Sequence, residues 1–124
     1  MKTAILLALM LALALLPGPR TVHAAANLFT PPLDAVAGDL GECRFANVAN
    51  FTRSVSILLR GEDGSTIASV FSLPVVAFGI TALASNSPIR FYCQFAFTGS
   101  AKSVRASAAV LPVGGSDKVS VPAQ

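Results

Sequence analysis

The sequence predicts an all-β protein, an antiparallel β-sandwich of six to seven strands. From Gly41 onward, short segments rich in Val, Ile and Phe are separated by Gly, Pro, Asn and Ser, a spacing typical of sandwiches and barrels. No segment there has an apolar stripe at helical period. Two cysteines, Cys43 and Cys93, lie on apolar faces of predicted strands, so a bridge between two sheets fits this fold.

The first 24 residues are predicted to be a cleavable secretory signal peptide. An apolar run extends from Ala4 to Leu16, and Val22 and Ala24 suit the −3 and −1 positions of a cleavage site before Ala25. The run is shorter than the roughly 20 residues of a membrane-spanning helix, and no later stretch is long enough. A membrane anchor is the alternative interpretation. We therefore expect an exported protein, periplasmic or extracellular, that is not membrane-spanning after processing.

Cleavage changes the charge and the chemistry of the chain. Loss of Lys2 and Arg20 leaves seven basic residues against six acidic ones, so the net charge falls from +3 to +1. The basic pI then gives no argument for a nucleic-acid partner. The only histidine, His23, leaves as well.

The mature chain is expected to form one domain. Residues 25–40 are predicted to be an N-terminal arm, with a short edge strand near Asn27–Thr30, and residues 41–124 a single sandwich. Further segments expected to be extended are Glu42–Asn47, Arg53–Arg60, Val75–Leu83, Ile89–Thr98, Ser103–Leu111 and Lys118–Val121. Gly79 interrupts the third of these and indicates a bulge or a close backbone approach.

The hairpin around Gly61–Gly64 allows two registers. A two-residue turn at Asp63-Gly64 would place Ala68, Val70 and Ser72 opposite the core residues of the preceding strand. A three-residue loop with Gly64 left-handed would place Ile67, Ser69 and Phe71 there. The second set is larger and more apolar, so it is preferred.

The last long hairpin is predicted from the parity of its apolar faces. A four-residue loop over 99–102 places large residues opposite small ones, as a packed layer requires. The predicted pairs are Phe97 with Val104, Phe95 with Ala106, Cys93 with Ala108, and Phe91 with Val110.

A single disulfide between Cys43 and Cys93 is predicted, because an even cysteine count in an exported protein indicates bridging. Closing a loop of about 50 residues contributes about 4 kcal/mol in the chain-entropy description. Two buried free thiols are the alternative. Two cysteines without histidine cannot complete a four-ligand metal site.

The mature residues point away from catalysis, and neither cofactor nor metal is expected. Histidine-dependent triads are unavailable, and a Ser-Lys pair would have to use Lys102 or Lys118, which lie in or beside loops. Glu62 and Asp63 are interpreted as turn residues. The acidic residues of the arm region form no recognisable calcium loop; they are Asp34, Asp39 and Glu42. The sequence Asn50-Phe51-Thr52 is a formal glycosylation acceptor and is interpreted as a turn.

The order of features resembles small secreted bacterial proteins with one disulfide and no assigned activity. The features are a first cysteine strand, an Asn-rich turn, a Val/Ile strand closed by a Gly-containing hairpin, a Phe-Tyr-Cys-x-Phe strand and an Arg-bearing strand, over about residues 40–111. The cysteine spacing is also similar to that of immunoglobulin-type sandwiches. However, no Trp lies between the cysteines, and Tyr92 is adjacent to Cys93 rather than two residues before it.

We expect a non-catalytic exported module that binds a protein or a cell-envelope polymer through its surface. The candidate face carries Arg90, Tyr92, Gln94 and Arg105, because Tyr and Arg are enriched in interface hot spots. The alternative is that these residues have no binding role and are simply the solvent-exposed polar side chains of an outer sheet face. A fibre subunit assembling by strand addition and a small hydrolase without histidine are the competing functions.

Overall fold

The computed structural model describes residues 25–86, 90–112 and 119–124. These residues form nine strands and one short 3-10 turn, η1 (Ala101–Ser103). The strands are β1 (Ala25–Phe29), β2 (Leu33–Asp34), β3 (Leu40–Asn47), β4 (Arg53–Gly61), β5 (Thr66–Val75), β6 (Ile80–Ser85), β7 (Arg90–Thr98), β8 (Val104–Leu111) and β9 (Val119–Pro122). The predicted signal peptide lies outside the described residues.

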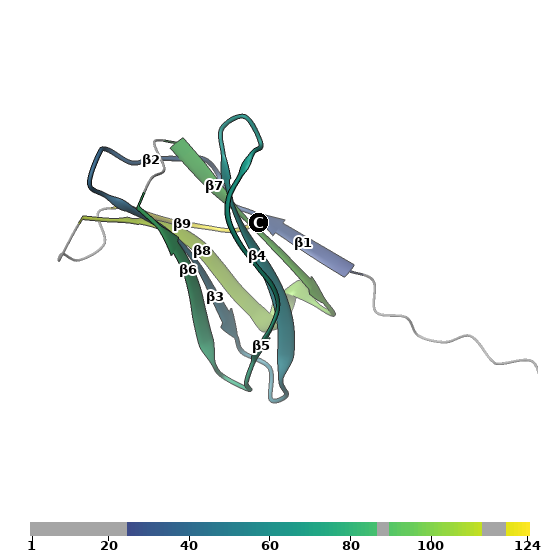
Figure 1. Cartoon of the computed structure of the whole chain (residues 1–124). Coiled ribbons are helices and arrows are strands. Elements are labelled where there is room, and N and C mark those ends of the chain that lie inside the picture. Colours follow the sequence, from purple (N-terminus) through teal and green to yellow (C-terminus); the bar gives the residue numbers. More distant parts are fainter. Residues whose placement is uncertain (1–24, 87–89, 113–118) are drawn as a thin grey trace, which may run out of the picture.

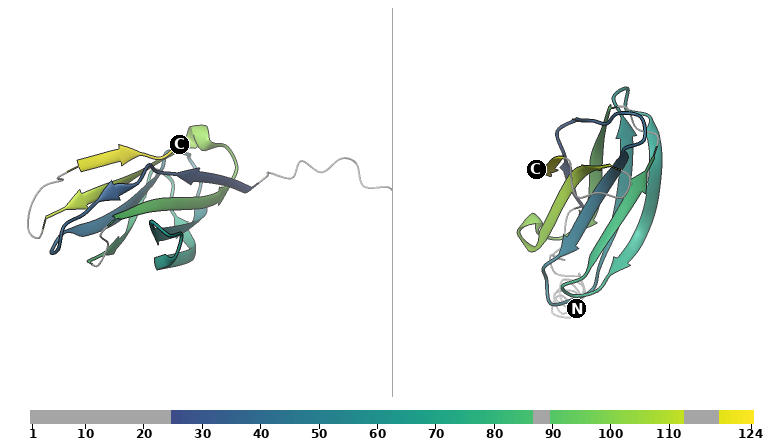
Figure 2. Two further views of the ribbon diagram at one scale, coloured as in Figure 1. Left: turned by 90° about the horizontal axis from the view of Figure 1, so that it is seen from above. Right: turned by 90° about the vertical axis from the view of Figure 1, so that its left-hand side faces the viewer.

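Two antiparallel sheets pack face to face, which confirms the predicted sandwich (Figure 1). The first sheet has the order β1-β7-β4-β5, and β2 also pairs with β7. The second sheet has the order β6-β3-β8-β9. The two layers are seen from further directions in Figure 2. Nine strands exceed the six to seven expected, partly because β2 is only two residues long and carries no alternation that could reveal it.

The core lies between the sheets and follows the predicted alternation. Along β7, for example, Phe91, Cys93, Phe95 and Phe97 are buried while the residues between them are not. The Phe45 ring lies 6.1 Å from that of Phe95 and 5.8 Å from that of Phe97, measured between centroids. The buried cluster comprises Leu33, Ala35, Cys43, Phe45, Val55, Ile57, Leu59, Val75, Phe91, Cys93, Phe95, Phe97, Val104, Ala108 and Val110.

The predicted disulfide is confirmed and joins the two sheets. Cys43 on β3 belongs to the second sheet and Cys93 on β7 to the first, and their Cα atoms are 5.7 Å apart. Both residues are fully buried. The covalent link therefore crosses the centre of the core.

As in an immunoglobulin domain, the disulfide joins one interior strand of each sheet. However, the strands near the two ends of the chain lie in the opposite sheets from those of an immunoglobulin domain. In immunoglobulin sheets the strand before the first cysteine strand pairs with it, and the strand after the second cysteine strand pairs with that one. Here β1 pairs with β7, the second cysteine strand, whereas β8 pairs with β3, the first. The sandwich thus departs from immunoglobulin topology at both ends of the chain.

The predicted pairing of the last hairpin is wrong. β7 pairs with β1, β2 and β4, while β8 pairs with β3 and β9, so Ala108 lies opposite Cys43 and not Cys93. The chain crosses from one sheet to the other through η1. The inward face was nevertheless correct, because Val104, Ala108 and Val110 are buried. The alternation of apolar residues determines only which side of β8 points inward. A hairpin with β7 and a crossing to the other sheet give the same alternation.

The preferred register of the β4–β5 hairpin is also wrong beyond its turn. Gly64 has a φ of +84°, as expected for the three-residue loop. However, Ala68 and Val70 lie opposite Leu59 and Ile57. The register shifts between Arg60 and Leu59, where Ile67 is the extra residue on β5. Such a bulge reverses the faces that follow it.

A second register shift, between Ile57 and Val55, returns the later part of β5 to its original parity. There the backbone N–H of Ser72 donates to Ser56 Oγ at 3.1 Å, and Ser72 has a φ of +51°. Because the first shift reverses the sides of the residues that follow it, Phe71, predicted to face the core, is 67% exposed. Leu73 packs against the core instead.

The expected strand over Val75–Leu83 is two strands joined by a turn. β5 ends at Val75 in the first sheet and β6 begins at Ile80 in the second. The predicted close approach at Gly79 is real, because a Cβ there would lie 2.8 Å from Val76 Cγ2 and 2.9 Å from Val76 O.

The N-terminal arm needs a similar correction, since 25–40 contributes β1 and β2 to the first sheet. β1 pairs along its whole length with β7. On its other side, Phe29 and Gln124 each donate a backbone N–H to the other's carbonyl at 2.9 Å. The arm is therefore an integral part of the sandwich and closes one of its sides.

Candidate interaction surfaces

The four residues of the predicted binding face do not share one surface. Arg90, Tyr92 and Gln94 lie on the outer side of β7 in the first sheet. Arg105 lies on β8 in the second sheet, opposite Ala46, and its Nη1 donates to the carbonyls of Lys102 and Val104. The expectation that Arg105 shares a face with the three β7 residues depends on the predicted β7–β8 pairing, which does not form.

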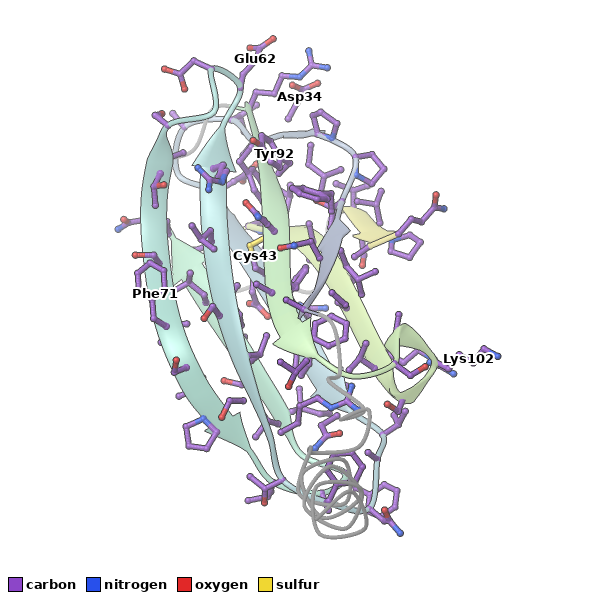
Figure 3. All side chains as sticks on the ribbon, turned by 90° about the vertical axis from the view of Figure 1, so that its right-hand side faces the viewer. Asp34, Cys43, Glu62, Phe71, Tyr92 and Lys102 are labelled. Atoms are coloured by element: carbon purple, nitrogen blue, oxygen red, sulfur yellow. A yellow bond between two sulfur atoms is a disulfide. The ribbon has the colours of Figure 1, made fainter. Side chains whose placement is uncertain are left out.

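Two of the three residues that remain together make polar contacts within the protein. Gln94 Oε1 accepts from Arg60 Nε at 2.8 Å, and Gln94 Nε2 donates to Asn27 Oδ1 at 3.3 Å. Arg90 lies 3.7 Å from Asp34 and 4.0 Å from Glu62. Tyr92 is half-buried opposite Arg60. Figure 3 shows Tyr92 near the end of the molecule that carries Asp34 and Glu62. The side chains of Arg90 and Gln94 are thus already engaged by neighbouring residues of the protein.

The acidic residues have local structural roles. Asp63 Oδ1 accepts from the Ser65 hydroxyl at 2.6 Å and from its backbone N–H at 3.0 Å, which lowers the pKa of Asp63 below its ordinary value. Glu42 pairs with Arg44 at 2.6 Å, and Asp39 accepts from the Val36 N–H. Within the described ranges, no three potential ligands among His, Cys, Asp and Glu are grouped to hold a metal ion.

A surface that the sequence did not reveal is formed by three loops at one end of the sandwich, 48–52, 76–79 and 99–103. We call it the loop end; its first two loops lie at the bottom of Figure 1. Buried Asn47 joins the first two, because its Nδ2 lies 2.8 Å from Phe51 O, 3.1 Å from Val75 O and 3.2 Å from Val76 O. Val48 N–H donates to Ser103 O at 3.0 Å, which adds the third loop.

The loop end exposes large apolar side chains. Phe78 is 71% exposed and Val76 65% exposed, and Val48 and Phe51 are exposed beside them. Phe78 also has a φ of +59°, a left-handed conformation that is uncommon for a bulky residue. Phe78 N–H donates to Ala49 O at 3.3 Å, so the backbone that carries this exposed ring is bonded to the 48–52 loop.

β5 forms one edge of the first sheet and β6 one edge of the second, and these two edges differ. β5 carries two register shifts and Pro74, features that discourage pairing with another strand. β6 has an uninterrupted register with β3 from Ser85 to Ile80 and contains neither charge nor proline. No described strand pairs with its other side. Ile80, at the start of this edge, is 78% exposed.

The chain matches no protein-family model and no curated protein sequence. In the part of the chain that the structure covers, there is no helix with the length and apolar character needed to cross a membrane.

Proposed function

We propose that this protein is an exported, non-catalytic β-sandwich module that acts by binding a protein or a cell-envelope polymer. The observation that carries this proposal is the loop end, where a well hydrogen-bonded framework presents exposed apolar side chains. Rigid apolar anchors that need no reordering on contact favour binding. We therefore place the proposed binding surface at the loop end and not on the outer side of β7, which carries Arg90, Tyr92 and Gln94.

Export is supported by the disulfide, because such bridges persist in oxidising compartments. The proposal includes removal of residues 1–24. Intact mass spectrometry of the exported protein should give the mass of a chain that starts at Ala25 with one disulfide. A species that retains Met1 would contradict this part of the proposal.

The binding role is tested by sedimenting the exported protein with isolated cell-envelope material. The test variant combines Val76→Thr with Phe78→Asn, because Asn tolerates a positive φ and Thr keeps the shape of Val. We expect binding to weaken by about tenfold or more, the effect of losing interface anchors. The matched control is Phe71→Ser, which removes an equally exposed ring from β5. Equal binding by all three proteins would rule out the loop end.

Strand addition is the second candidate function, favoured by the unprotected edge of β6. Another strand pairing there would extend the second sheet by main-chain hydrogen bonds. We expect concentration-dependent oligomers in size-exclusion chromatography, abolished by Ala82→Lys on β6. Ser69→Lys on the β5 edge is the control and should not change them. A monomer at all concentrations would remove this candidate.

A further inference from the structure

Arg53 is a buried cation at the loop end. Arg53 is only 5% exposed, and it lies on the same inward side of β4 as Val55 and Ile57. Nη1 donates to Ser100 O at 3.1 Å and Nη2 to Ser103 Oγ at 2.7 Å. The Nε atom is buried and has no hydrogen-bond partner.

The guanidinium has no carboxylate partner among the described residues. Its Cζ lies 5.3 Å from the Phe51 ring centroid and 5.6 Å from that of Phe97, and such contacts offset part of the desolvation cost of a cation. A buried charge without a counter-ion is nevertheless expensive. The described acidic side chains lie elsewhere: on β2, around the start of β3, and in the β4–β5 hairpin. They are Asp34, Asp39, Glu42, Glu62 and Asp63.

A cavity of about 330 Å³ opens beside this cation. The side chains of Phe51 and Arg53 form part of its lining, and the remaining lining comes from the end of β7 and the loop after it: Thr98, Gly99, Ser100 and Ser103. The lining thus contains a guanidinium, three hydroxyl groups and an aromatic ring, and no acid. Guanidinium and hydroxyl groups donate to phosphate and carboxylate oxygens in proteins. The Ser103 hydroxyl already donates to Ser100 O at 3.0 Å, so the guanidinium and the hydroxyls of Thr98 and Ser100 are the donors for an anion.

The lack of a side chain at Gly99 leaves space beside the Arg53 guanidinium, and the nearby loop carries a lysine. Gly99 has a φ of +101°, and a Cβ there would lie 3.2 Å from Arg53 Nη2. Lys102 lies exposed in the same loop, and Arg105 donates to its carbonyl at 3.0 Å. Figure 3 shows Lys102 well away from Asp34 and Glu62. The charged side chain of the 99–103 loop is thus a lysine, and this loop contains no carboxylate.

We propose that the Arg53 cavity binds an oxyanionic group, a phosphate or a carboxylate. The anion supplies the counter-charge that no described side chain places beside Arg53. This site goes beyond the proposed function, because the apolar side chains of the loop end could bind a partner without it. The same chemistry could come from a free anion or from an anionic lipid headgroup.

The site is tested by titrating the exported protein with sodium phosphate, and separately with sodium acetate, at constant ionic strength. The readout is the chemical shift of the amides of Gly99, Ser100 and Ser103. Vesicles of phosphatidylglycerol, with phosphatidylcholine vesicles as the comparison, form the third arm. Saturable shifts with either small anion support the proposal. Binding to the phosphatidylglycerol vesicles alone also supports it and assigns the anion to a lipid headgroup.

Variants separate binding from folding. Arg53→Met should remain folded, because Ser103 Oγ keeps its own bond to Ser100 O at 3.0 Å, and should weaken anion binding by at least about tenfold. Arg60→Met, at the other end of β4, is the matched control and should bind as the wild type does. If Arg53→Met does not fold, Thr98→Val, which changes an exposed hydroxyl of the lining, should weaken binding severalfold. Absence of saturable shifts and of vesicle binding in the wild type would overturn the proposal.

Discussion

Asn47 organises the loop end from a fully buried position. It continues the inward side of β3 beyond Phe45, where an apolar residue would be the ordinary choice. Its amide instead supplies hydrogen bonds to the backbone of the two neighbouring loops, and its Oδ1 accepts from Ala49 N–H at 3.1 Å. Backbone that turns between sheets leaves polar groups without ladder partners, and this one side chain satisfies several of them.

Replacing Asn47 by alanine should therefore destabilise the domain. Each buried acceptor left without a partner costs about 1–3 kcal/mol, so the free energy of unfolding should fall by about 2–3 kcal/mol. Chemical denaturation measures this change. Asn50→Ala, in the same turn but exposed, should stay within about 0.5 kcal/mol of the wild type. Equal effects at the two positions would show that the Asn47 contacts are not needed.

At the scale of elements, β5 shows why alternation alone could not predict the register. The pattern of β5 fits either face, and the larger apolar residues, Ile67 and Phe71, favoured the wrong one. Each of two bulges adds one residue and reverses the faces. A bulge depends on the partner strand and on local backbone conformation, so the sequence of β5 by itself does not encode a visible signal for it.

Single polar substitutions distinguish the two registers. Phe71→Ser should change the free energy of unfolding by no more than about 0.5 kcal/mol, because the ring is exposed. Val70→Thr should lower it by about 1–3 kcal/mol, because Val70 packs against the core and the hydroxyl would lack a partner. Thermal and urea unfolding of both variants provide the measurement. The reverse order of effects would restore the register that the sequence favoured.

At the scale of the whole molecule, the disulfide joins β3 and β7, two interior strands of the facing sheets. Cys43 and Cys93 are separated by 50 positions in the chain, so their bond removes much of the conformational freedom of the unfolded state. Replacement of both by alanine should lower the free energy of unfolding by about 2–5 kcal/mol. Equilibrium unfolding of the double variant measures this. An unchanged stability would mean that packing alone holds the sheets together.

The sandwich and the inward sides of β3, β4, β7 and β8 could be predicted from the sequence, because they follow from alternation. The Phe residues of β7 and the two cysteines were correctly placed on this basis. The sheet to which β8 belongs could not be predicted, because the residues of β8 alternate in the same way whether the strand forms a hairpin with β7 or crosses to the other sheet. The loop end was missed because Val76 and Phe78 fall in an apolar run that resembles a strand. Arg53, a charge on the inward side of β4, was the available signal for the cavity.

The central claim is that the loop end is the binding surface, and the most direct measurement is an NMR chemical-shift map. The exported protein, labelled with ¹⁵N, would be titrated with solubilised cell-envelope material that retains it in sedimentation. The amides of the loop end (48–52, 76–79 and 99–103) should shift or broaden, while those of Arg90, Tyr92 and Gln94 should not. Perturbations centred on these three residues, with the loop end unchanged, would contradict the account.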